Sequence, residues 1–119
     1  MIVRQSMQNM KDKILNENKK RILSLIGIGR AAGLVSTGYD KAVAAVKTRR
    51  SFFLLAANDI SEKTKKNLKY ETEKENIPIF FPDISMFEMS NALGTKTGIV
   101  SVNDKGISRK VREAIGENI

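Results

Sequence analysis

The chain has 119 residues, of which 41% are hydrophobic, and it carries a formal net charge of +8 at pH 7. This length suits one domain with a core of its own. The chain has no Cys and no His, which excludes disulfides, thiolate or imidazole metal sites and the usual catalytic triads. We therefore expect a non-catalytic protein without metal or cofactor. No signal-peptide pattern and no spanning apolar run are seen, so we expect a cytoplasmic protein without a membrane partner.

The positive charge is concentrated in one part of the chain. Residues 19–66 contain eleven basic and three acidic residues, whereas residues 1–18 sum to +1 and residues 67–119 to −1. A contiguous basic stretch of this kind is typical of a protein that binds a polyanion such as nucleic acid. A basic surface that serves only solubility remains the alternative.

Periodicity predicts the elements of the first half in chain order. Residues 1–18 are expected to form a polar, partly frayed extension, and residues 19–119 a single domain. Apolar residues at helical spacing predict a first helix that ends near Gly33. A short strand, "LVS", follows, and then a helix that Thr37 caps together with Asp40. The apolar run "SFFLLAA", residues 51–57, predicts a central strand that is covered on both faces.

The second half continues the alternation. Asp59 and Glu62 predict a capping box at the start of a polar helix. "IPIFF" then predicts a strand. Ser85 and Glu88 predict a second capping box, at the start of a helix that Gly94 closes. "GIVSV" predicts a fourth strand, and a last helix buries the face of residues 107, 111, 114 and 115. The order α-β-α-β-α-β-α-β-α predicts an α/β protein, a three-layer α-β-α sandwich around a small four-stranded mixed sheet.

Two motifs could indicate a nucleotide-binding or a catalytic site. "GIGRAA" matches a dinucleotide fingerprint at Gly27, Gly29 and Ala32, but Gly33 and a strand follow at once, where a long helix is required. Close packing of a helix is the better interpretation of these glycines. The carboxylates could form a metal or acid–base set, but four of the five stand at predicted helix starts, where capping explains them. These carboxylates are Asp40, Asp59, Glu62, Asp83 and Glu88.

The predicted start of the second helix is the best candidate for a binding site. Gly38, Tyr39, Asp40 and Lys41 would place free backbone donors, a ring, an acceptor and a cation side by side. Such a set can contact nucleobase edges while nearby cations hold phosphates. An ordinary capped helix is the alternative. The lysines of "SEKTKKN" could likewise contact phosphate or be merely solvated.

Several of these stretches resemble a known family. "AAGLVSTG" before a helix, "LLAANDIS" before a lysine-rich helix, "MSNALG" and "GIVSVND" are similar to the kink-turn RNA-binding ribosomal protein superfamily of the L-seven-Ae and L-thirty-e type, in particular its bacterial YlxQ-like branch. The resemblance extends over residues 19–115. It implies the α/β/α fold and an RNA-binding function, ribosomal or ribosome-associated.

The resemblance also implies positions for the site. The residues after the family's glycine contact the sheared G·A pairs of a kink-turn, which gives Gly38, Tyr39, Asp40 and Lys41 here; by position, Asn58 and Phe81 line the RNA pocket. The chain departs from the family at several positions: Asp40-Lys41 replaces Asn-Glu or Lys-Gln, Ala44 replaces a Lys, and Met89-Ser90 replaces Leu-Gly. An ionised Asp cannot donate a hydrogen bond, whereas the family's Asn or Lys can.

The expected function is non-catalytic binding of structured RNA, with a kink-turn as one candidate. The expected phosphate contacts are Arg30, Lys47, Arg49, Arg50, Lys63 and Lys65. The expected partners are RNA and the ribosome, with no small-molecule substrate. Two alternatives remain: a protein–protein interaction module on the same scaffold that binds RNA weakly or non-specifically, and a small nucleotide-binding enzyme that uses "GIGRAA".

Overall fold

The computed structural model describes residues 2–116 and, among residues 2–12, the side chain of Met10 only. The elements follow the predicted order. The helices are α1 (Ile2–Ala31), α2 (Tyr39–Lys47), α3 (Glu62–Lys74), α4 (Met86–Leu93) and α5 (Lys105–Ile115). The strands are β1 (Val35–Thr37), β2 (Phe53–Ala56), β3 (Ile79–Phe80) and β4 (Ile99–Val102).

The four strands form one mixed sheet in the order β1-β4-β2-β3. β4 runs antiparallel to β1 and β2, whereas β3 runs parallel to β2. All residues of β2 and β4 are buried, as expected for central strands covered on both faces. The chain therefore has the predicted α/β fold, a three-layer α-β-α sandwich.

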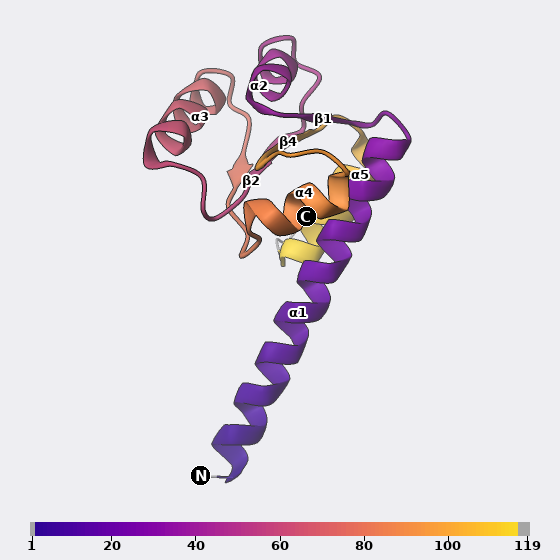
Figure 1. Cartoon of the computed structure of the whole chain (residues 1–119), viewed down its shortest axis with the longest axis vertical. Coiled ribbons are helices and arrows are strands. Elements are labelled where there is room, and N and C mark those ends of the chain that lie inside the picture. The colour runs from indigo at the N-terminus through magenta and orange to yellow at the C-terminus, as the bar shows by residue number, and fades with distance from the viewer. Residues whose placement is uncertain (1, 117–119) are drawn as a thin grey trace.

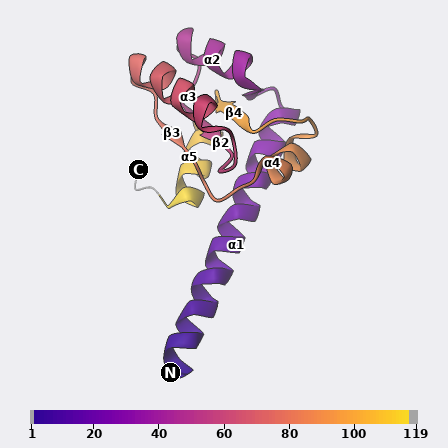
Figure 2. The ribbon, with the colours of Figure 1, turned by 60° about the vertical axis from the view of Figure 1, so that its left-hand side comes forward.

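The helices form the two outer layers. Figure 1 and Figure 2 show α2 and α3 on one side of the sheet and α1, α4 and α5 on the other. Phe53 is fully buried in the core and meets the ring of Phe80 edge to face, with ring centres 5.3 Å apart. No helix among the described residues has an apolar stretch long enough to cross a membrane.

Helix α1 is longer than the sequence predicts. It begins at Ile2, so that residues 2–18, expected to be partly frayed, are helical and continuous with the rest of α1. No Gly or Pro interrupts residues 2–26, and either residue would weaken a helix. Its N-terminal half projects from the body (Figure 1). The division into an extension and a domain stays a prediction.

The glycines of "GIGRAA" lie inside α1. A Cβ atom on Gly27 would come within 2.8 Å of the backbone oxygen of Ala92 in α4, and one on Gly29 within 2.9 Å of a methyl group of Val35. These glycines let α1 approach its neighbours closely, as the packing interpretation predicts. A dinucleotide fingerprint must open a helix, so this placement contradicts the nucleotide-binding alternative.

Of the three predicted N-terminal helix caps, two are wrong and one is confirmed. Thr37 does not cap α2, which begins after Gly38 without a side-chain cap. Asp59 does not cap α3; Ser61 does so by accepting from the backbone N–H of Thr64. The capping box of Ser85 and Glu88 in α4 is present. Sequence spacing alone does not distinguish among neighbouring candidates for a cap, since the backbone path decides which one reaches the free N–H groups.

Candidate nucleic-acid interface

Three strand-to-helix connections leave the sheet at the same end. Because β4 is antiparallel to β1 and β2, and β3 is parallel to β2, the carboxyl ends of β1, β2 and β3 lie beside the start of β4. Gly38, Asn58 and Phe81 follow these three strands within two residues. The backbone N–H of Gly38 donates to the oxygen of Ile99 over 2.9 Å, which ties the first connection to β4. The three predicted positions therefore lie at one end of the sheet.

Gly38 has a backbone conformation that other residues avoid. Its φ is 89° and its ψ is 160°, a region that is almost exclusive to glycine. A Cβ atom built on Gly38 would meet nothing within 4 Å outside its immediate neighbours. Its backbone requires glycine, and the space beside it is open to a partner.

The start of α2 leaves backbone donors without a side-chain acceptor. Side chains cap the N-termini of α3, α4 and α5, but none caps that of α2. Ala42 is the first residue of α2 whose N–H bonds within the helix, to the oxygen of Gly38. The N–H groups of residues 39–41 therefore point out of the helix end, together with its positive dipole. An acceptor on a partner can bind there.

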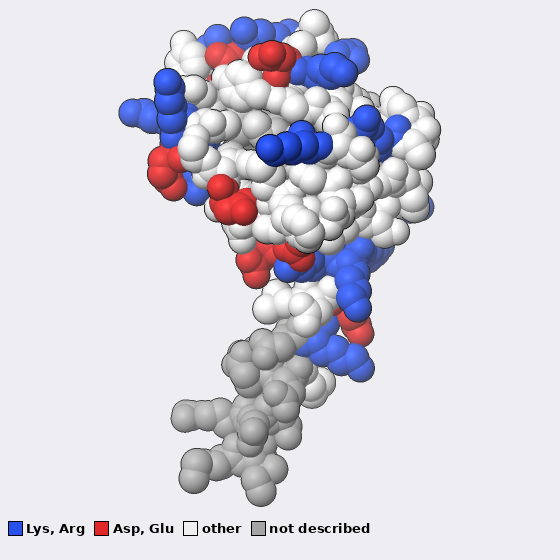
Figure 3. Space-filling model, in the orientation of Figure 1, with Lys and Arg blue, Asp and Glu red and all other residues white. Residues whose placement is uncertain are grey.

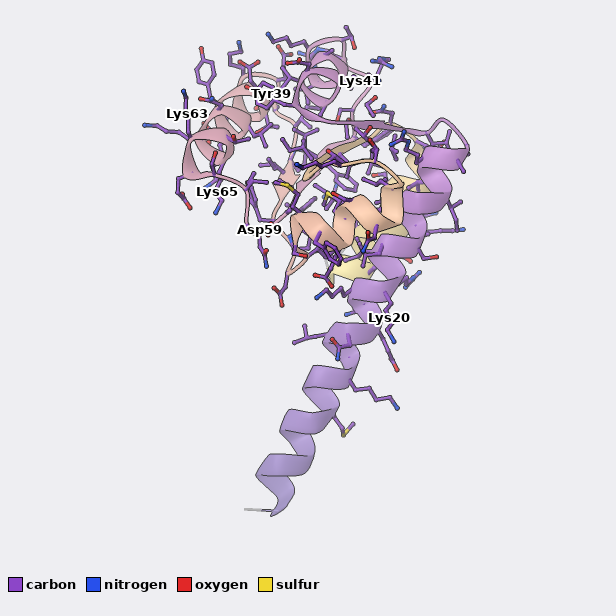
Figure 4. All side chains as sticks on the ribbon, in the orientation of Figure 1. Lys20, Tyr39, Lys41, Asp59, Lys63 and Lys65 are labelled. Atoms are coloured by element: carbon purple, nitrogen blue, oxygen red, sulfur yellow. The ribbon has the colours of Figure 1, made fainter. Side chains whose placement is uncertain are left out.

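The side chains of this helix start differ in exposure. Tyr39 is half-buried and packs against the core, whereas Asp40 and Lys41 are exposed. Lys41 forms no ion pair with any residue that the structure describes. Figure 4 shows Tyr39 and Lys41 at the start of α2. Tyr39 is thus suited to packing, and Lys41 to contact with an anion.

A hollow of about 290 Å³ adjoins this site between α2 and α3. Ala44 lines it, at the position where the family resemblance implies a Lys. The short side chain leaves the hollow open, and Tyr39, Asp40, Val43, Lys47 and Glu71 form its other walls. The departure at Ala44 therefore changes the shape of the surface as well as its charge.

Asn58 and Asp59 hold the second connection in place. The amide of Asn58 donates to the carboxylate of Asp83 over 2.7 Å, and the backbone N–H of Met86 donates to the carboxylate of Asp59 over 2.8 Å. Both contacts join the end of β2 to the segment before α4. Asp59 therefore caps the start of α4, 27 residues away, and not that of α3. Asn58 is an exposed residue whose amide is already engaged.

The start of α4 is also tied to α1. Glu88 accepts the backbone N–H of Ser85 and pairs with Lys19 over 2.8 Å. These hydrogen bonds, chiefly the one with Lys19, hold the pKa of Glu88 below its usual range. The hydrogen bond with Glu88 in turn raises the pKa of Lys19. These contacts fix the start of α4 relative to α1 and to the end of β2.

Phe81 carries two cations over its ring. The ammonium groups of Lys65 and Lys69 lie 5.3 and 5.6 Å from the ring centre. Such distances allow cation–π attraction. Phe81 is half-buried, so at this edge of the sheet the lysines, more than the ring, face a partner.

The structure divides the predicted phosphate contacts into two groups. Arg30 donates to the hydroxyl of Thr37 over 3.4 Å, next to Gly38, and Lys63 and Lys65 stand in the first turns of α3 (Figure 4). The other three lie at the far end of α2, about 13 Å away for a nine-residue helix. There Lys47 pairs with Glu71 over 3.5 Å and Arg49 with Glu75 over 3.3 Å, while Arg50 donates to Thr48.

This face of the molecule is basic but not uniformly so. Figure 3 shows Lys and Arg side chains gathered over α2 and α3, with Asp and Glu side chains among them. Glu71 and Glu75 lie on α3 or directly after it and neutralise cations at the end of α2. The sequence gives no sign of these pairs, because they depend on how α2 and α3 pack.

From the sequence we did not predict how the loop after α4 is held in place. The hydroxyl of Ser90 accepts from the backbone N–H of Thr97 over 3.0 Å. A Cβ on Gly98 would come within 3.0 to 3.3 Å of the side chains of Ile60 and Met86. Ser90 stands where the family resemblance implies glycine, and here it fastens the loop to α4. The sequence signal for this contact was a polar residue, Ser90, at a position where the family has glycine.

No metal site is evident among the residues that the structure describes, since no group of three or more Asp or Glu side chains is arranged to bind a metal ion.

An uncapped helix start, an open glycine and nearby cations at one end of the sheet define a small α/β/α protein with a surface suited to an extended anionic partner. Comparisons with known proteins agree with this class.

The chain is similar to proteins described as RNA-binding. The RNA-binding protein YlxQ of Enterococcus faecium is 29% identical over 102 residues, which are 85% of this chain and 98% of that protein. A protein of unknown function from Bacillus halodurans has the same fold with a TM-score of 0.75 and 28% identity, over 82% of this chain and 98% of the other.

A third likeness concerns the fold alone. The 15.5 kD RNA-binding protein of Giardia lamblia matches with a TM-score of 0.68 and 19% identity, over 84% of this chain and 86% of the other. No protein-family model matches the chain. The similarity to YlxQ confirms the expected resemblance to the YlxQ-like branch of the L-seven-Ae and L-thirty-e type.

Proposed function

We propose that this chain is a non-catalytic protein that binds structured RNA through the start of α2, residues 37–41. The observation that carries this proposal is the open N-terminus of α2 beside Gly38, with Lys41 exposed and unpaired among the described residues. The similarity to YlxQ supports it. Backbone donors and a cation can contact base edges and phosphates together.

The finer proposal is a ribosomal or ribosome-associated RNA, with a kink-turn as the first RNA to test. In this binding mode, Gly38 permits close approach of the RNA to the backbone, and Asp40 and Lys41 contact base edges. Arg30 and Lys63 supply the phosphate contacts nearest to them. Lys47 and Arg49 are already paired, so we expect them to contribute less.

The test is binding of purified, nuclease-treated protein to a kink-turn RNA and to a matched RNA with its G·A pairs replaced, across a salt series. Tight binding that is lost on replacement supports readout by the helix start. Equal, steeply salt-dependent binding to both RNAs indicates phosphate contacts alone. The variant Lys41→Glu with Lys63→Glu should weaken binding and reduce the salt slope; an unchanged slope would remove these residues from the interface.

A protein-interaction role is the second candidate, and the projecting part of α1 favours it. Met10, Ile14 and Leu15 expose 63%, 51% and 65% of their surfaces. Large exposed apolar side chains in one segment can mark an interaction site. Pull-down from lysate with and without nuclease separates the two functions, because partners held through RNA are lost on nuclease treatment and direct protein partners are retained.

A further inference from the structure

A shallow basic hollow lies on α3, apart from the start of α2. It has a volume of about 290 Å³ and is lined by Lys65, Lys66, Lys69 and Glu62. The side chain of Glu62 is 89% exposed and, among the described residues, forms an ion pair only with Lys65, over 3.5 Å. Three ammonium groups therefore share the hollow with one solvated carboxylate.

The lysines of the hollow are held close together. Lys65 and Lys69 are four residues apart on one helix, and both lie within 6 Å of the centre of the Phe81 ring. Like charges at this spacing destabilise a helix. The ring holds these two cations in place, and an anion bound between them would relieve their repulsion. Lys66 is exposed and pairs with no acid among the described residues.

We propose that this hollow binds backbone phosphates of the same RNA that docks at the start of α2. This inference rests on the proposed function. Lysine binds phosphate as a point charge, and an open hollow suits a phosphodiester of a continuous strand. Phe81 follows β3 at the same end of the sheet as Gly38, so one RNA can reach both places.

The sheet order gives the approximate separation of Gly38 and Phe81, which follow the two edge strands and lie beside the two contacts. β1 and β3 are the edge strands of the sheet, three strand spacings apart, which is about 14 Å. Stacked nucleotides advance about 3.4 Å each, so the hollow lies about four nucleotides from the helix start. An RNA that ends fewer than about four nucleotides from the start of α2 cannot occupy both the helix start and the hollow.

The experiment compares two triple variants with equal loss of charge. One neutralises the hollow with Lys65→Gln, Lys66→Gln and Lys69→Gln. The control neutralises three exposed cations of α5, which covers the other face of the sheet, with Lys105→Gln, Arg109→Gln and Lys110→Gln. Affinity for the best-binding RNA is measured across a potassium chloride series, with that RNA at full length and cut back from either side.

We expect the hollow variant to lower the salt slope by about 2, at roughly 0.7–0.9 per lost phosphate contact, while the control lowers it by much less. On an RNA cut back to within three nucleotides of the docking point, the hollow variant should equal the unmodified protein. Equal losses in both variants would show that only net charge matters and would overturn the proposal.

Two further measurements separate the remaining outcomes. Lys66→Gln alone removes no contact to Phe81, so it keeps the test valid if the triple variant folds poorly; it should lower the slope by about 0.7–0.9. A thermal shift with inorganic phosphate that only the hollow variant loses would indicate a site for a free anion and overturn the RNA assignment. If the unmodified protein binds no RNA, the proposed function fails as well.

Discussion

The backbone of Gly38 is the residue-scale feature on which the candidate site depends most. Its φ of 89° and ψ of 160° turn the chain from the end of β1 into α2 without a capping side chain. The turn leaves the first donors of α2 open. A side chain at this position would strain the backbone even though the space beside it is empty.

We expect Gly38→Ala to lower the free energy of unfolding by about 1–3 kcal/mol, as measured by denaturant unfolding. Gly33→Asn is the matched control, because Gly33 has a φ of 73° in a region that Asn tolerates, and its effect should be smaller. If both variants unfolded alike, the conformation of Gly38 would not be a source of strain. RNA affinity should fall in Gly38→Ala alone.

At the scale of elements, α1 and α4 are joined by a close approach of their backbones. A Cβ on Gly27 would meet a backbone oxygen, that of Ala92, whereas a Cβ on Gly29 would meet a side-chain methyl of Val35. A methyl group can move at little cost, and a helix backbone cannot. A side chain at position 27 is therefore expected to cost more stability than one at position 29.

We expect Gly27→Ala to destabilise the protein by about 1–3 kcal/mol through overpacking, despite the better helix propensity of Ala. Gly29→Ala should be less harmful and serves as the control. Thermal and denaturant unfolding of both variants decide the matter. A Gly27→Ala protein as stable as the parent would mean that α1 and α4 separate easily.

The pair of Lys19 and Glu88 joins the same two helices by charge. Because the pKa of Glu88 is lowered in the folded state, its stabilising effect is full above the unfolded glutamate value and is lost as the pH falls through the lower folded value. The raised pKa of Lys19 acts in the opposite direction, so its contribution is lost only at strongly alkaline pH.

The stability difference between the parent and Glu88→Gln should therefore shrink as the pH is lowered from 7 to 3. Denaturant unfolding across this range measures it. Glu62→Gln is the control, since the side chain of Glu62 is 89% exposed and should show little difference at any pH. A constant difference for Glu88→Gln would mean that the pair with Lys19 does not form.

At the scale of the whole molecule, α1 accounts for the elongated shape. The principal extents are 52, 30 and 29 Å, and the N-terminal half of α1 projects along the longest (Figure 1). Met10, Lys13 and Ile14 are exposed. The body, by contrast, is held by the buried strands β2 and β4 and by the helices on both faces.

We expect deletion of residues 1–12 to change the free energy of unfolding by less than about 0.5 kcal/mol, the usual range for surface changes. Small-angle X-ray scattering should show a shorter longest dimension. RNA affinity should be retained if the sheet end is the interface. A large fall in melting temperature would show that the projecting segment belongs to the folded core.

The sequence by itself determined the order of the elements, the central place of residues 53–56 and 99–102, and the capping box of α4, because these depend on periodicity and on contacts a few residues apart. It also placed Gly38 at a helix start. It did not show that α1 begins at Ile2, since apolar periodicity is the main sequence signal for a helix and the polar residues 1–18 show little of it.

Only the tertiary structure decided which groups at the site remain available. Asp59 was expected to cap α3 but reaches α4, and Glu71 and Glu75 neutralise Lys47 and Arg49. The strand order placed Phe81 and the lysines of α3 at the same sheet end as Gly38. These outcomes depend on segments that are distant in the chain, and their contacts follow from packing, which local sequence patterns do not encode.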